Sequence, residues 1–137
     1  MSNSLTVHIR SFAYKNGVPD APHTHGEGYV FDCRAIHNPG RYAEYIHLTG
    51  RDEPVKTFLK ERGEAAEFLQ QVYALVDFSV VTYLRRGFDH LSVNFGCTGG
   101  QHRSVYCADQ LAAHLKDKFQ LNVELIHAEQ ERKGWKN

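Results

Sequence analysis

The residues best suited to chemistry run from Gly96 to Val105 and read Gly-Cys-Thr-Gly-Gly-Gln-His-Arg-Ser-Val. They follow an alternating apolar run at 90–95 and precede a helical pattern that begins near Arg103. Glycines let backbone N–H groups turn towards one ligand, and the first turn of a helix attracts negative charge. Arg103 adds a guanidinium, while Thr98 and Ser104 add hydroxyl groups. The stretch therefore predicts an anion site, with phosphate as the expected ligand.

The same stretch contains the pattern Cys-x-x-Gly-x-x-Arg-Ser, formed by Cys97, Gly100, Arg103 and Ser104. In cysteine-dependent phosphatases this spacing surrounds a thiol with loop amides and a guanidinium, which acidify it for attack on phosphorus. Such an enzyme also needs a general acid, and no recognisable aspartate loop is present. Three interpretations remain open: a phosphatase, a phosphate-binding loop without chemistry, and a structural turn. We favour the second, which involves no catalysis, and the sequence leaves enzymatic activity open.

Motifs in separate parts of the chain carry a family resemblance. They are Ser11-Phe-Ala-Tyr-Lys15 with Gly17 and Pro19, Val30-Phe-Asp-Cys-Arg34, Asn38-Pro39, Leu48-Thr-Gly-Arg-Asp-Glu-Pro-Val55 and the glycine loop itself. In this order they resemble the C-terminal domain of RapZ, the bacterial RNase adapter protein, and its YvcJ-type relatives. The similarity runs from about residue 5 to beyond residue 120. Several ordered motifs are much harder to match by accident than one loop.

The resemblance implies an α/β domain of phosphofructokinase-like character that binds an aminosugar phosphate, glucosamine-6-phosphate in RapZ. It also implies RNA binding, a role as a regulatory adapter with a protein partner, and self-association into a homo-oligomer. Full-length relatives carry a nucleotide-binding P-loop domain. Because this chain has no Gly-x-x-x-x-Gly-Lys-Ser/Thr motif, we expect it to correspond to the sensor half alone.

Two features depart from the family pattern. The family's Asn-Pro-His loop has Gly40 at the histidine position, and the nearby basic side chains are His37 and Arg41. The family's basic tail is replaced by residues 127–136, in which acidic and basic side chains nearly cancel. Because RNA affinity depends on neutralising several phosphates, we expect RNA binding to be weak and to require an oligomer.

Composition fits one domain over residues 1–137. Sixteen basic and sixteen acidic residues leave no net charge, so the chain lacks a global electrostatic footprint for nucleic acid. Its three cysteines, Cys33, Cys97 and Cys107, show no paired spacing, and neither a signal peptide nor a long apolar segment is visible. We therefore expect a reduced, cytoplasmic setting without membrane association.

The chain's periodicities predict a small mixed or parallel sheet flanked by helices. Strands are expected at 5–12, 29–35, 90–95 and 121–126, and a loop at 13–28. Helices are expected from Asp52 or Glu53 to Gly63, from 64 to 86, and from Arg103 onwards. Apolar spacing selects the inward faces of the last two helices: Ala65, Phe68, Leu69, Val72, Leu75, Val76, Val80 and Tyr83, then Val105, Ala108, Leu111, Ala112 and Leu115.

Ligands of such a sheet gather where its strands end. The proposed binding residues therefore lie after three separate segments: Asp32, Arg34, Thr49, Gly50, Cys97, Thr98, Gly99, Gly100, His102, Arg103 and Ser104. Thr49, Gly50 and part of the case for His102 depend on the resemblance. Asp32 is equally well explained as the partner of Arg34 or Arg103, and Asp52 as a helix cap.

The nine histidines of the chain also suggest a metal site. His23, His25 and Cys33 could hold a metal, but no fourth ligand has motif spacing, so we expect neither metal nor cofactor. A protein-interaction module with a vestigial pocket is the last alternative, after the phosphatase that would use Cys97 and Arg103. The sequence favours a phosphosugar sensor or adapter.

Overall fold

Four parallel strands form the centre of the protein, in the order β2–β3–β1–β4. They are β1 (Thr6–Ala13), β2 (Tyr29–Asp32), β3 (His90–Cys97) and β4 (Asn122–His127). The computed structural model describes residues 5–21, 23 and 28–137. Because every neighbouring pair is parallel, the predicted choice between a mixed and a parallel sheet resolves to parallel. All four strands consequently end at one edge.

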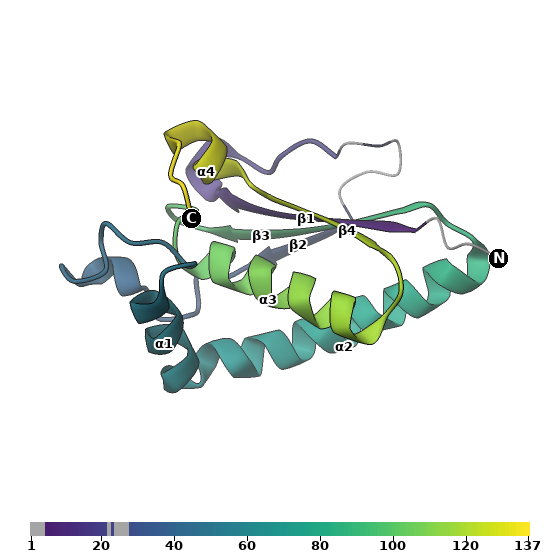
Figure 1. Cartoon of the computed structure of the whole chain (residues 1–137), viewed down its shortest axis with the longest axis horizontal. Coiled ribbons are helices and arrows are strands. Elements are labelled where there is room, and N and C mark those ends of the chain that lie inside the picture. Colours follow the sequence, from purple (N-terminus) through teal and green to yellow (C-terminus); the bar gives the residue numbers. More distant parts are fainter. Residues whose placement is uncertain (1–4, 22, 24–27) are drawn as a thin grey trace.

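Helices flank this sheet to complete a single α/β domain. α3 (Arg103–Lys118) packs directly on β1 and β3, with α1 (Glu53–Arg62) and α2 (Glu64–Arg86) outside it (Figure 1). The short α4 (Ala128–Lys133) lies on the opposite side, beside the segment that follows β1 (Figure 1). No helix in the described ranges has the length and apolar character needed to cross a bilayer.

Most predicted elements are confirmed to within two residues, and α2 has the expected bounds. The second strand is shorter than predicted: it ends at Asp32, because a turn closed by the Ile36 N–H and the Cys33 carbonyl begins there. Two 3-10 turns, Tyr14–Asn16 and Pro39–Arg41, lie in segments predicted as loops. α4 was not predicted.

The core lies between the sheet and α3. All five predicted apolar positions of α3 are buried, and β1 and β3 are buried along nearly their whole length. On α2, Leu75 was predicted to face inwards but is 49% exposed. Val72 and Val76, also predicted to face inwards, are buried, while the neighbouring Leu75 lies on the exposed side of the helix.

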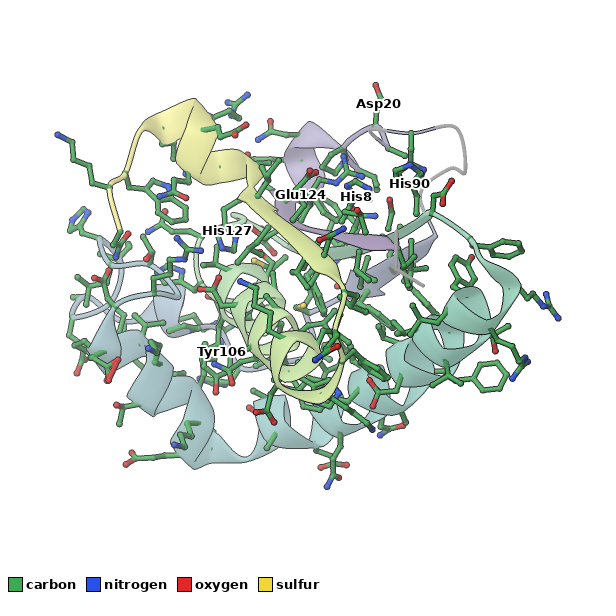
Figure 2. The ribbon with its side chains drawn as sticks, turned by 45° about the vertical axis from the view of Figure 1, so that its right-hand side comes forward. His8, Asp20, His90, Tyr106, Glu124 and His127 are labelled. Atoms are coloured by element: carbon green, nitrogen blue, oxygen red, sulfur yellow. The ribbon has the colours of Figure 1, made fainter. Side chains whose placement is uncertain are left out.

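The opposite face of the sheet carries polar side chains. His8 Nε2 lies 3.0 Å from His90 Nδ1, and His8 Nδ1 lies 2.9 Å from the Glu124 carboxylate. His23, from the segment after β1, stacks on His90 and contacts the Ser92 hydroxyl. Figure 2 shows His8, His90 and Glu124 together on three strands. These contacts attach the segment to the sheet without an apolar layer.

Candidate functional site

A cavity of about 400 Å³ opens beside the end of the sheet where the glycine loop begins. Three arginines line it from separate segments: Arg34 follows β2, Arg41 ends the 3-10 turn, and Arg103 begins α3. The remaining lining residues are Ala35, Ile36, His37, Asn38, Glu64 and Thr98. Three guanidinium groups around one polar cavity suit a ligand with several negative oxygens.

Arg103 is held rigidly at the base of this cavity. Its side chain is only 5% exposed, and Nη1 donates to the carbonyls of Arg34 and Ile36 at 3.0 and 2.9 Å. Its Nε is buried without a hydrogen-bond partner. A buried unsatisfied donor on a cation is costly, and an anionic oxygen is the group that satisfies it best.

Arg34 occupies the more exposed rim. Its Nε and Nη2 donate to Asp32 at 2.9 and 2.8 Å, and its guanidinium lies 4.1 Å from the centre of the Tyr14 ring. The bonds from Arg34 lower the pKa of Asp32 below its usual value. Asp32 is therefore placed as a partner of Arg34, which was one of its two predicted roles. Its carboxylate pre-orients the arginine.

Arg41 and His37 are the cavity residues that sequence reasoning treated only as substitutes. Asn38 Oδ1 accepts from the Gly40 N–H, which fixes the turn that aims Arg41 at the cavity. Arg41 forms no salt bridge in the part of the chain that the structure describes. His37 Nε2 lies 2.7 Å from the Tyr42 hydroxyl. The Asn-Pro pair was the signal for this turn.

The glycine loop turns Thr98 and Gly99 outwards and Gly100 inwards. Thr98 is exposed and lines the cavity, and a Cβ on Gly99 would meet no atom within 4 Å. Gly100 has φ +65°, and its Cα faces Glu129 and the β1 backbone so closely that a Cβ would lie 2.7 Å from Glu129 Cγ. Thr98 and Gly99 are consequently the loop residues best placed for a ligand.

Cys97 and Ser104 face the core rather than the cavity. The Cys97 thiol is 3.1 Å from the Ser104 hydroxyl, and the two residues are 2% and 0% exposed. Neither lines the cavity. A nucleophile must reach its substrate, so this arrangement does not suit attack on phosphorus.

His102 connects the loop to the segment that precedes α1. Its Nε2 donates to the Tyr45 carbonyl at 2.9 Å, and burial lowers its pKa. The imidazole is therefore neutral near physiological pH and adds no charge to the site. A Cβ on Gly40 would lie 3.5 Å from His102 Nδ1, so the position where the family pattern has histidine adjoins His102.

Gly50 is packed against the start of α3, and neither Thr49 nor Gly50 lines the cavity. The Gly50 N–H donates to the Gln101 carbonyl, and Asp52 Oδ2 accepts from the Thr49 N–H at 2.7 Å. Asp52 occupies the N-cap position of α1 as predicted, but its side chain bonds Thr49 and Asn137 instead of the helix amides. The loop that carries Thr49 and Gly50 is therefore joined to the glycine loop by the hydrogen bond from Gly50 to Gln101.

A second polar network, which sequence reasoning missed, ties α3 to β4. The Asp109 carboxylate accepts from His127 Nε2 and from two nitrogens of Arg51, each at 2.9 Å. His127 Nδ1 accepts from the buried Ser11 hydroxyl at 2.6 Å. Figure 2 shows His127 where β4 meets α4. The four residues are distant in sequence, and no local motif joins them.

We expect Asp109→Asn to destabilise the fold by about 2 kcal/mol near neutral pH, since charged hydrogen bonds are lost. Burial alone would raise the pKa of Asp109, but the bonds from His127 and Arg51 lower it overall. A lowered folded pKa gives stability that is present above the unfolded value and lost as pH falls through the folded one. In urea unfolding, the difference in unfolding free energy between wild type and Asp109→Asn should therefore become smaller below about pH 4. An equal difference in unfolding free energy at neutral and strongly acidic pH would contradict a stabilising role of the Asp109 carboxylate.

The predicted metal alternative gains no geometric support. Within residues 5–21, 23 and 28–137, no three His, Cys, Asp or Glu side chains are grouped to hold an ion. His25 lies outside the described residues. Cys33 is buried beside Cys107, and burial raises the pKa of its thiol.

Comparison with known proteins gives the family. The RapZ C-terminal domain family matches residues 5–131. The chain belongs to this family. The resemblance seen in the ordered motifs is thereby confirmed, and the RapZ C-terminal domain accounts for nearly the whole described chain.

Curated relatives are longer proteins that share this domain. A nucleotide-binding protein of Fusobacterium nucleatum is 36% identical over 135 residues, covering 96% of this chain and 45% of that protein. One of Xylella fastidiosa strain 9a5c is 37% identical over 130 residues (95% and 43%), and one of Janthinobacterium sp. strain Marseille is 42% identical over 113 residues (82% and 37%). The chain therefore spans less than half the length of these relatives.

Proposed function

We propose that this RapZ C-terminal domain is a sensor that binds a phosphorylated small molecule in the three-arginine cavity. The observation that carries the proposal is Arg103: a buried guanidinium, fixed by two carbonyls, with Nε unsatisfied beside the glycine loop. Arg34 and Arg41 supply further donors, and Thr98 supplies a hydroxyl. The amides at the start of α3 favour the same charge.

An aminosugar phosphate carries an ammonium group as well as a phosphate, and this suits the acidic side chain that lines the cavity. Glu64 is the one carboxylate among its described lining residues; it accepts from the His37 N–H at 3.2 Å, and its other near neighbour is Arg62 at 3.6 Å. A ligand with phosphate at one end and ammonium at the other would match the arginines and Glu64 respectively. The polar lining and the side chains of His37 and Asn38 suit sugar hydroxyl groups.

A thermal-shift screen tests this function. Glucosamine-6-phosphate at about one hundred times its Kd should stabilise the protein by about 2.7 kcal/mol, or roughly 8 °C. Glucosamine without phosphate should have no effect, and glucose-6-phosphate should have a smaller one, because it lacks the ammonium group. Nucleotides belong in the same screen, since the relatives are named nucleotide-binding proteins. A larger shift with nucleotides than with any phosphosugar would refute the aminosugar assignment.

Cys97→Ser separates a sensor from a phosphatase. The Cys97 thiol is buried against Ser104, so the variant should keep its phosphosugar affinity within about threefold. Wild-type protein should release no phosphate from a generic aryl phosphate. Calorimetry and a phosphate-release assay measure the two quantities. Turnover that requires the Cys97 thiol would favour the phosphatase.

Adapter roles involve partners beyond the small ligand. We expect binding to RNA to be weak, because the basic side chains of the tail, Arg132 and Lys133 among them, lie beside Glu129 at 3.5 and 3.9 Å, which reduces the net positive charge there. A ligand bound at the glycine loop would instead lie at the same end of the sheet as the surface offered to a protein partner.

A further inference from the structure

The segment that follows β1 begins with a tight turn whose first residue is Tyr14. This 3-10 turn, Tyr14–Asn16, is closed by the Gly17 N–H, which donates to the Tyr14 carbonyl at 3.1 Å. Asn16 Nδ2 donates to the buried Glu129 carboxylate at 2.8 Å and thereby ties the turn to α4, which lies beside it (Figure 1). The backbone of Tyr14 is therefore fixed by its own turn and by α4.

The Tyr14 ring is enclosed by neighbours on β1 and β3. It packs edge-on against Phe12, with 4.9 Å between the ring centres, and Phe12 is only 1% exposed. Gly96 on β3 faces both rings, because a Cβ there would lie 2.6 Å from Tyr14 Cε2 and 2.5 Å from Phe12 Cζ. The missing side chain at Gly96 thus makes room for the two rings. Packing therefore fixes the orientation of the Tyr14 ring.

Arg34 lies over the face of this ring. Its guanidinium carbon is 4.1 Å from the ring centre, within the range of about 6 Å in which an aromatic face attracts a cation. The Asp32 carboxylate also binds Arg34, but both side chains of that ion pair are about half exposed, and such a pair holds a long side chain only weakly. Burial and the Asp32 carboxylate raise the pKa of Tyr14, so the phenol stays neutral and the contact uses its ring face.

We propose that Tyr14 is a positioning residue of the three-arginine cavity, whose ring holds the Arg34 guanidinium ready for an anionic ligand. The inference rests on the proposed function, in which Arg34 donates hydrogen bonds to the ligand. A side chain that is already ordered loses less conformational entropy when the ligand binds. Tyr14 is not among the lining residues of the cavity, so it acts through Arg34. This gives a role to the first family motif, Ser11–Lys15, which the cavity lining leaves unexplained.

Calorimetry of the full chain with glucosamine-6-phosphate tests the role of the ring. Tyr14→Leu keeps an apolar side chain but removes the aromatic face, and it should weaken binding roughly three- to tenfold. Tyr14→Phe keeps the ring and should bind within about twofold of wild type. Tyr73→Leu is the matched control and should bind like wild type. Tyr73 is also partly buried and stacks on a basic side chain, His114 at 4.0 Å, but it does not line the cavity.

The NMR signals of the Arg34 side chain give a readout that a general loss of stability would not move. In the free protein, the ring current of Tyr14 should displace these signals, because the guanidinium lies over the ring. The displacement should persist in Tyr14→Phe and disappear in Tyr14→Leu.

The outcomes separate this inference from the proposed function. If wild type binds glucosamine-6-phosphate and Tyr14→Leu binds equally well, or if Tyr14→Phe loses as much affinity as Tyr14→Leu, the positioning role is wrong while the cavity assignment stands. Arg34 signals that are the same in Tyr14→Leu and wild type also contradict the positioning role. If wild type itself binds no glucosamine-6-phosphate, the proposed function fails and this inference fails with it.

Discussion

Arg103→Ala should weaken binding of glucosamine-6-phosphate at least tenfold. Each charge-assisted hydrogen bond contributes about 1.5–3 kcal/mol, and the variant removes all that Arg103 can make to the ligand. It also removes the bonds from Nη1 to the Arg34 and Ile36 carbonyls, which hold the neighbouring cavity wall in place. Isothermal titration calorimetry measures the loss.

Two further variants show whether a loss of affinity comes from the missing positive charge or from a disturbed fold. Arg41→Ala removes a cavity guanidinium that makes no described salt bridge, so it should lower affinity several-fold without changing stability. Arg86→Ala is the matched control, because it removes the same charge from an exposed position at the far end of α2, and it should bind like wild type. Undiminished affinity in Arg103→Ala would show that the ligand lies elsewhere.

Gly50→Ala should lower the melting temperature by about 10 °C, which corresponds to about 3 kcal/mol for a chain of this size. A Cβ at Gly50 would point at the backbone of α3, 2.7 Å from the Tyr106 nitrogen and close to the His102 carbonyl. Backbone atoms cannot move aside as a flexible side chain does. The start of α3 must therefore shift, and with it Arg103.

Gly99→Ala is the matched control for this prediction. It makes the same chemical change in the neighbouring loop, where a Cβ meets no atom within 4 Å and φ is not positive. Its melting temperature should stay within about 3 °C of wild type. Scanning calorimetry compares the two variants, and equal melting temperatures would mean that Gly50 is not in close contact with α3.

Local patterns were sufficient to predict most of the helices and strands and to place the glycine loop between a strand and a helix. A strand, a run of glycines and a helix start are adjacent in sequence, so residues 96–105 could be interpreted without knowing the fold. The end of α1 at Gly63 was also predictable from the local sequence, because the left-handed φ of +83° at this position favours glycine. The RapZ family assignment added Thr49 and Gly50, whose own chemistry did not single them out.

Features that depend on tertiary packing could not be read in this way. α4 has six residues and mostly charged side chains, so it lacks an apolar period; the structure fixes it by burying Glu129 beneath Gly100. Arg41 enters the cavity only because the Asn38–Pro39 turn directs it there. Thr49 and Gly50, expected at the ligand, lie outside the arginine cavity, and Gly50 contacts the glycine loop and the start of α3.

An NMR titration of labelled protein with glucosamine-6-phosphate tests the cavity assignment most directly. Amide signals of Thr98, Gly99 and Arg103 should shift together and saturate, and so should the amide signal of Arg41, which also lines the cavity. Val123, in the edge strand β4, should not move. Saturable shifts confined to other parts of the chain, or no shifts at millimolar ligand, would contradict a phosphosugar site between the glycine loop and the three arginines.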